Sequence, residues 1–226
     1  MAASGKLLEL FYDVVSPYSW LAFEVLCRYR NVWNVDLRLR PGFLGGLMNL
    51  SGNRPPAMVP LKGLYMVKDI DRLAQYCNVP LRQPSDFFGS VIEKGSLQAM
   101  RFVTAVEMKH PEFVESVSRE LWMRIWSRDE DITQPESLLA AASKAGVQPQ
   151  HAKELLGMIS NPDVKNRLKQ TTDEAAKHGA FGMPVIVVHV DGVPHMFFGS
   201  DRFELIAYLL REKWFGPVPS RNAPKL

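Results

Sequence analysis

The sequence predicts an α/β protein in which a β-α-β segment, an all-helical block and a β-β-α segment follow one another. Strand-like apolar segments occur only near the two ends of the chain, over residues 7–15, 35–40 and 184–198. Between about residues 63 and 179 the apolar residues recur every three to four positions, as in helices, and none of them alternate with period two. Strands are therefore expected at both ends of the chain and helices between them.

The first segment has the pattern of a strand-helix-strand unit. Residues 7–15 (LLELFYDVV) are strongly apolar and rich in aromatic and β-branched types, which is typical of a strand covered on both faces. Residues 20–30 repeat apolar side chains with helical spacing. Residues 35–40 (VDLRLR) alternate apolar and charged side chains, as a half-buried strand does. Short connections favour a right-handed parallel crossover between the two strands.

A segment rich in glycine and proline, residues 41–62, precedes the helical block and predicts a long ordered loop or short broken helices. From residue 63 to residue 179 we expect roughly five helices. Prolines at helix starts and glycines just after helix ends mark two of them. These markers are Thr133 and Pro135 with Gly146, and Asn161-Pro162 with Gly179.

The last segment predicts a β-hairpin followed by a helix. Asp191-Gly192 lies between two apolar runs, which is a strong signal for a two-residue turn. Pro194 lies near the start of the second run, which is acceptable on an edge strand. Asp201 and Glu204 have the spacing of a capping box at the start of an amphipathic helix.

This order is that of a thioredoxin-like fold with a large all-α domain inserted between its βαβ and ββα halves, as in DsbA. We therefore predict a discontinuous thioredoxin-like domain over residues 1–62 and 180–219. The inserted helical domain is expected over residues 63–179, and a C-terminal tail over residues 220–226.

Composition and charge exclude several classes of protein. Basic residues exceed acidic ones by three and are scattered, so no nucleic-acid partner is expected. No apolar run approaches the ~20 residues that a membrane span needs. Cys27 and Cys77 lie far apart, which argues against a disulfide scaffold and for a reducing compartment rather than secretion. The five histidines lack metal-ligand spacing, so no metal is expected.

The corner at Ser16-Pro17-Tyr18-Ser19 is the first candidate site. Several redox folds carry two cysteines here, but this chain has serine at both positions, so dithiol exchange is not available. Ser16 before Pro17 has the pattern of an N-cap, and Asn161-Pro162 repeats that pattern, so spacing alone favours a capping role. A capping hydroxyl accepts with its lone pair and keeps one donor free, which a thiolate could use.

Two further positions are open to a structural and a functional interpretation. Met183-Pro184 immediately precedes a strand, where proline can simply begin the strand. In thioredoxin-like folds the proline here is usually cis, and the residue before it offers its main chain to an extended peptide. Ser200-Asp201 can cap the last helix, or its helix N-terminus can bind a carboxylate.

Several segments resemble the kappa-class glutathione transferases along almost the whole chain. The bacterial 2-hydroxychromene-2-carboxylate isomerases and the DsbA-type disulfide oxidoreductases are wider relatives of that class. The matching segments are FYDVVSPYSW, GNRPP, GLYMVKD, RELWMRIWSRDEDIT, GAFGMPV and FFGSDRFELIAYLL.

The resemblance implies an enzyme that uses glutathione as co-substrate and has no other cofactor. It implies that Ser16 is the catalytic residue, which stabilises the glutathione thiolate. It implies that Ser200 and Asp201 contact the γ-glutamyl group and that Asn53 and Lys62 contact the glycyl end. Arg202 is a further candidate that could reach a neighbouring subunit. The implied glutathione-binding residues are Ser16, Pro17, Tyr18, Asn53, Lys62, Met183, Pro184, Ser200, Asp201 and Arg202.

The main hypothesis is a transferase that conjugates glutathione to small hydrophobic electrophiles. Whether the enzyme also reduces peroxides stays open. The alternatives are a glutathione-dependent isomerase of the 2-hydroxychromene-2-carboxylate type, and a non-catalytic glutathione-binding or chaperone-like module. The resemblance also implies a homodimer and a location in mitochondria or peroxisomes. The final Pro224-Lys225-Leu226 weakly resembles a peroxisomal address.

Overall fold

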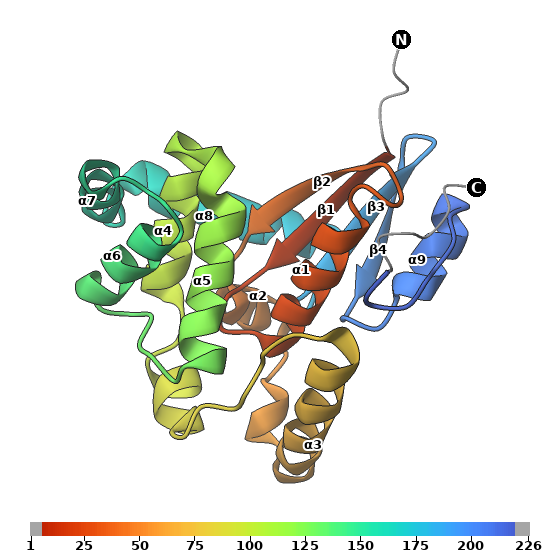
Figure 1. The fold of residues 1–226 in the computed structure, drawn as a ribbon, viewed down its shortest axis with the longest axis horizontal. Helices are drawn as coiled ribbons and strands as arrows, with labels where there is room; N and C mark the ends of the chain where they lie inside the picture. The colour runs from red at the N-terminus through yellow and green to blue at the C-terminus, as the bar shows by residue number, and fades with distance from the viewer. Residues whose placement is uncertain (1–5, 220–226) are drawn as a thin grey trace.

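The computed structural model describes residues 6–219, which form one four-stranded sheet with the order β2-β1-β3-β4 (Figure 1). Strand β1 (Lys6–Tyr12) pairs in parallel with β2 (Val35–Pro41). Strand β3 (Val185–Val190) pairs antiparallel with both β1 and β4 (Val193–Phe198). The predicted parallel β-α-β unit and the predicted hairpin are confirmed.

The corner between β1 and helix α1 (Pro17–Tyr29) differs from the prediction in one respect. Strand β1 ends at Tyr12, whereas the apolar run predicted a strand to residue 15. The Asp13 carboxylate accepts a hydrogen bond from the Val15 N–H at 2.9 Å, and the Ser16 N–H donates to the Asp13 carbonyl at 3.0 Å. These bonds close a turn, so the last apolar residues are buried outside the sheet.

Six α-helices cover residues 60–177 of the described chain, so the prediction of roughly five was low. The segment before them is partly helical, as expected for short broken helices. Helix α3 begins before residue 63, three residues earlier than the predicted boundary. The elements between β2 and β3 are α2 (Leu44–Ser51), a 3-10 turn (Pro56–Met58), α3 (Pro60–Cys77), a π-helical turn (Phe88–Glu93), α4 (Leu97–Lys109), a 3-10 turn (Pro111–Phe113), α5 (Val114–Ser127), α6 (Pro135–Lys144), α7 (Pro149–Met158) and α8 (Pro162–Lys177).

The helical block and the sheet share one hydrophobic core. In Figure 1, α1 lies in front of the sheet, α4 to α8 gather beyond the β2 edge, and α3 projects below. Tyr12 on β1, Phe23 on α1 and Trp122 on α5 belong to the same buried cluster, and their rings are 4.8 to 6.1 Å apart. The Tyr12 hydroxyl also lies 2.6 Å from Ser118 Oγ. The insertion therefore packs directly against the first half of the sheet.

The predicted capping box at the last helix is not formed. Helix α9 (Phe203–Leu210) begins two residues after Asp201, and its N-cap is Arg202, which makes no side-chain capping bond. The Asp201 carboxylate instead accepts a hydrogen bond from the Arg202 guanidinium at 3.1 Å. Both residues of the hairpin turn, Asp191 and Gly192, have positive φ angles of 52° and 78°, as the Asp-Gly signal predicts.

None of the helices in residues 6–219 has the length and apolar character that crossing a membrane requires. The predicted tail, with its Pro224-Lys225-Leu226 address, lies outside the described residues.

Helix α8 provides a test of the capping pattern that also begins α1. Asn161 Oδ1 accepts a hydrogen bond from the Asp163 N–H at 2.8 Å, ahead of Pro162. Asn161→Ala should lower the free energy of unfolding by about 1 kcal/mol, because that N–H loses its partner. Chemical denaturation measures the change. Gln148 precedes Pro149 in the same position but makes no capping bond, so Gln148→Ala is the matched control. An equal loss in both variants would contradict the prediction.

Candidate active site

Ser16 caps helix α1 as the sequence predicts. Its Oγ accepts a hydrogen bond from the Ser19 N–H at 3.1 Å, and its carbonyl accepts one from Trp122 Nε1 at 3.2 Å. The first turn of α1 contains no acidic residue that would neutralise the positive end of the helix dipole. The Tyr18 N–H has no hydrogen-bond partner within residues 6–219. The corner can therefore stabilise an anion.

The donor side of Ser16 is engaged, which corrects the expectation that it is free. Ser16 Oγ donates a hydrogen bond to the Met183 carbonyl at 3.2 Å. The Met183-Pro184 peptide is cis, as is usual for this position in thioredoxin-like folds. Ser16 is 4% exposed and Met183 is 5% exposed. One hydrogen bond thus joins the candidate thiol activator to the candidate peptide-docking residue.

The two serines of the corner have different environments. Ser19 is fully buried, and its hydroxyl has no hydrogen-bond partner among the residues that the structure describes. Ser16 lies one turn earlier, and its hydroxyl both donates one hydrogen bond and accepts another. Ser16, and not Ser19, is therefore the hydroxyl that links the start of α1 to the cis-proline loop.

Asn53 lies beside the same loop as Met183. It follows α2, and its side-chain amide donates a hydrogen bond to the Phe181 carbonyl at 2.8 Å. Its Oδ1 accepts from the Arg54 N–H at 2.8 Å. The side chain is exposed on a loop, as the sequence indicated. The structure therefore brings Asn53 to the edge of the cis-proline loop.

The C-terminal candidates divide into two sets. The Gly199 N–H donates to the Pro184 carbonyl at 3.0 Å, which places buried Ser200 next to the cis-proline loop. Asp201 and Arg202 are exposed and bond to each other. Among the described residues neither makes a hydrogen bond to Ser16, Met183 or Asn53, so the structure does not join these two to the corner.

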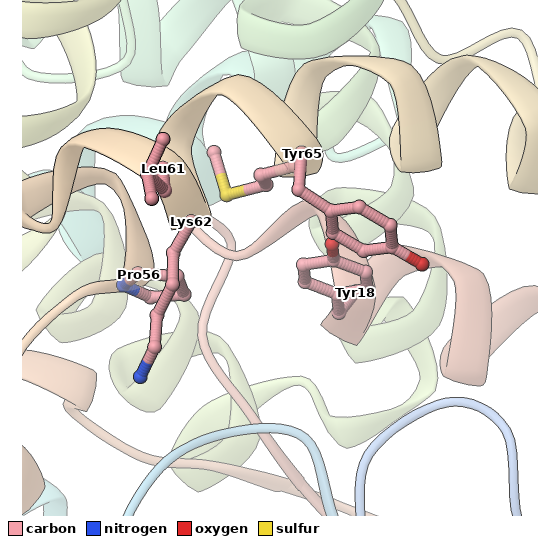
Figure 2. A pocket seen from close by; sticks show the side chains of 6 residues that line it. Tyr18, Pro56, Leu61, Lys62 and Tyr65 are labelled. Carbon is pink, nitrogen blue, oxygen red and sulfur yellow. The ribbon is translucent and has the colours of Figure 1, made fainter.

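Tyr18 and Lys62 line one cavity of about 330 Å³ between α1 and α3 (Figure 2). Lys62 lies in the first turn of α3, which corrects the prediction that it lies on the irregular loop. The other lining residues are Pro56, Leu61, Tyr65 and Met66. The cavity is therefore mainly apolar, with one ammonium group and two tyrosine rings.

Asp69 holds the two tyrosines of this cavity. The Tyr18 hydroxyl donates to Asp69 Oδ2 at 3.0 Å, and the Tyr65 hydroxyl donates to Oδ1 at 3.2 Å. Burial, followed by the Asp69 carboxylate, raises the pKa of Tyr18 above its usual range. Both hydroxyls are therefore occupied, and Tyr18 stays protonated at neutral pH.

Sequence reasoning did not find three residues that shape the site. Trp122 contacts the Ser16 carbonyl, Asp69 anchors the tyrosines, and Asp13 accepts three hydrogen bonds just before Ser16. The spacing of Tyr65 and Asp69, four residues apart on α3, could have indicated a pair. Asp13 is an acid in an apolar run, which is a weak signal. No sequence pattern near Trp122 indicates that its side chain contacts Ser16, which lies 106 positions away in the chain.

Comparisons with known proteins show the family to which the chain belongs. Residues 7–211 match the family model of the DsbA-like thioredoxin domain. The chain is 58% identical to human glutathione S-transferase kappa 1 over 219 residues, which cover 97% of each chain. It is 59% identical to the rat protein of that name over the same length and coverage.

A solved structure of a 2-hydroxychromene-2-carboxylate isomerase shares the fold, with a TM-score of 0.71 and 20% identity, over 91% of this chain and 94% of that one. The fold, the cis-proline beside a helix N-cap and the identity along almost the whole chain lead to the same assignment. The chain belongs to the DsbA-like thioredoxin family and, within it, to the kappa-class glutathione S-transferases.

Proposed function

We propose that this protein is a glutathione transferase in which Ser16 stabilises the thiolate of glutathione for attack on a small hydrophobic electrophile. The observation that carries the proposal is the position of Ser16 Oγ. It lies at the N-terminus of α1, within hydrogen-bonding distance of the Met183 carbonyl beside the cis-proline. Family membership supports the same activity.

The chemistry required is the stabilisation of an anion. A free thiol has a pKa of ~8.5 and is mostly protonated at neutral pH. A hydroxyl donor and the positive end of a helix both favour the thiolate. The corner offers Ser16 Oγ–H and the Tyr18 N–H, which has no hydrogen-bond partner among the residues that the structure describes, and the first turn of α1 contains no acid. The thiol proton is released to solvent.

Glutathione would replace the hydrogen bond between Ser16 and Met183. On binding, the Ser16 hydroxyl turns from the Met183 carbonyl to the sulfur, and that carbonyl then accepts from the peptide N–H of the glutathione cysteine. The number of hydrogen bonds is kept, so the exchange leaves no buried polar group unpaired. The free protein therefore holds the two groups in place for the ligand.

The ends of glutathione would extend to either side of this point. Ser200, next to Pro184, and Asp201 would contact the γ-glutamyl group, whose ammonium pairs with the exposed Asp201 carboxylate. Asn53 is beside the cis-proline loop, and with Lys62 it would contact the glycyl carboxylate. The bond between Asn53 and the Phe181 carbonyl keeps that amide close to Met183.

The apolar part of the cavity between α1 and α3 would bind the electrophile. Leu61, Tyr65 and Met66 supply apolar walls, and Tyr18 is in the helical turn that Ser16 caps. The thiolate forms the new carbon–sulfur bond, and the leaving group departs with its electron pair. The same thiolate-stabilising site would also suit an isomerase, which would require glutathione without consuming it.

Ser16→Ala should lower turnover by about 10- to 100-fold and raise the pKa of the bound thiol by one to two units. One hydrogen bond to a charged group contributes about 1.5–3 kcal/mol, which corresponds to that change. Glutathione affinity should stay close to that of the wild type, because the main-chain contacts remain. Ultraviolet titration of the thiolate in the complex measures the pKa, and steady-state kinetics measure turnover.

The same titration on the wild type separates the transferase from a non-catalytic glutathione-binding module. If the wild-type protein binds glutathione without lowering the pKa of its thiol, the protein is a binding module. If glutathione is required but not consumed with a chromene-carboxylate substrate, the isomerase is the correct function. Wild-type turnover in Ser16→Ala would refute the role of Ser16.

Tyr65→Ala tests the electrophile site. Removing the ring from the cavity wall should raise the KM for a chlorinated dinitrobenzene by about fivefold, through loss of on the order of 1 kcal/mol of apolar contact. The KM for glutathione should not change. Tyr76→Ala is the matched control, because Tyr76 is on the same helix and equally exposed (62% against 61%) but does not line the cavity. Equal effects in the two variants would place the electrophile elsewhere.

The proposal includes a homodimer. Outside the cavity, helix α3 exposes Leu64 (67%) and Val67 (38%) to solvent, and a second copy would cover such side chains. The exposed Arg202 could then reach the glutathione of the neighbouring subunit. Light scattering should give twice 25.6 kDa. A mass of one chain at micromolar concentration would contradict the dimer.

A further inference from the structure

Asp13 is an ionisable side chain beside the site that the mechanism above does not use. It is fully buried in the turn between β1 and α1, three residues before Ser16. Its Oδ1 accepts a hydrogen bond from the Val15 N–H at 2.9 Å. Its Oδ2 accepts from the Leu44 N–H and from Ser96 Oγ, both at 2.8 Å.

These three bonds connect three different elements. Val15 belongs to the turn that leads into Ser16, Leu44 is the first residue of α2, and Ser96 is the N-cap residue of α4. The residue before α2, Phe43, makes no side-chain capping bond, so the Asp13 carboxylate takes that role across the fold. One carboxylate therefore fixes the catalytic turn against α2 and the helical block.

Both arms of the proposed glutathione site start from this carboxylate. The first arm is the turn itself, because the N–H of Val15, the residue before Ser16, donates to Asp13 Oδ1. The second arm is α2, whose first residue donates to Oδ2 and whose C-cap, Gly52, directly precedes Asn53. Displacing Asp13 would change the distance between the thiolate donor and the residue that contacts the glycyl end.

The ionised form of Asp13 lowers the free energy of unfolding relative to the protonated form. Burial raises its pKa to about 6, and the hydrogen bonds from Val15, Leu44 and Ser96 only partly offset that effect. Because the folded pKa lies above the unfolded value, the contribution of Asp13 to stability is largest below pH ~3.9 and is lost as the pH rises to about 6. An acid that destabilises the fold at neutral pH is a candidate for a functional role.

Few charged groups act on this carboxylate. Within residues 6–219 no Lys, Arg or His forms an ion pair with it, and the groups that bond to it from α2, α4 and the turn are neutral. Its titratable neighbour on β1 is Tyr12, whose pKa is raised above its usual range by burial, so that phenol stays neutral. Burial, and not a charged partner, is therefore the main cause of the raised pKa of Asp13.

We propose that Asp13 is a positioning residue of the glutathione site, whose ionised carboxylate sets the Ser16 turn and the Asn53 arm at the spacing that glutathione requires. This inference rests on the proposed function. Protonation removes the negative charge that strengthens the hydrogen bonds from the Val15 and Leu44 N–H groups, and it places a proton on one of the two oxygens that accept them. Glutathione affinity should therefore fall as the pH decreases through about 6.

The test compares Asp13→Asn with the wild type by calorimetric titration of S-methylglutathione between about pH 5 and pH 7. This thioether has no thiol proton to lose on binding, so ionisation of the bound sulfur does not contribute to the pH dependence. The wild type should bind about 5- to 10-fold more weakly at the acidic end. Asp13→Asn should be weaker at neutral pH by a similar factor and should lose that pH dependence.

Asp131→Asn is the matched control. The Asp131 carboxylate likewise accepts from two backbone N–H groups and one hydroxyl just before a helix, α6, but it is not part of the site. It should lose stability without changing glutathione affinity. Should Asp13→Asn fail to fold, Ser96→Ala removes one bond to the carboxylate and should give a smaller change in the same direction.

The outcomes separate the two proposals. If the wild type lowers the pKa of the bound thiol and Asp13→Asn binds glutathione with wild-type affinity and pH dependence, the positioning role is wrong. If Asp131→Asn matches Asp13→Asn, the effect is general destabilisation and the positioning role is again wrong. If the wild type binds glutathione without lowering the thiol pKa, the proposed transferase function fails instead.

Discussion

The hydrogen bond from Ser16 Oγ to the Met183 carbonyl joins two parts of the chain that are 167 positions apart. It exists because β1 and β3 are neighbours in the sheet and run antiparallel, with Phe11 paired to Val185. The C-terminal end of β1 and the N-terminal end of β3 therefore lie next to each other, at the same end of the two central strands. Helix α1 begins there, and the cis-proline precedes β3 there, so sheet pairing places Ser16 beside Met183.

The helical insertion contacts the residues at this end of the central strands. Trp122 on α5 donates to the Ser16 carbonyl, Ser96 before α4 donates to Asp13, and α3 closes the cavity next to Tyr18. The insertion also shares its core with β1 and α1. Buried contacts therefore hold the turn before Ser16, the N-terminus of α1 and the wall of the cavity in place. Stabilisation of an anion requires donors that are fixed in this way.

The elements that the sequence predicted well are those with local causes. Period-two alternation located β2, the Asp191-Gly192 turn located the hairpin, and proline after a capping residue located the start of α8. The error at the end of β1 arose where distant partners intervene. The strand ends early at the turn that the Asp13 carboxylate stabilises, and the other bonds to that carboxylate come from residues 44 and 96. The missing capping box is a local difference, because α9 begins at Phe203 and the exposed Asp201 carboxylate pairs with the adjacent Arg202.

The sequence by itself determined the absence of a dithiol at Ser16 and Ser19, the position of the helix N-cap and the family. These depend on residue identity and on neighbours within a few positions. Only the tertiary structure decided where the Ser16 donor points, that Lys62 shares a cavity with Tyr18, and that Asp201 and Arg202 stay at the surface. Those features depend on contacts between distant segments, which sheet pairing and core packing create and no local pattern encodes.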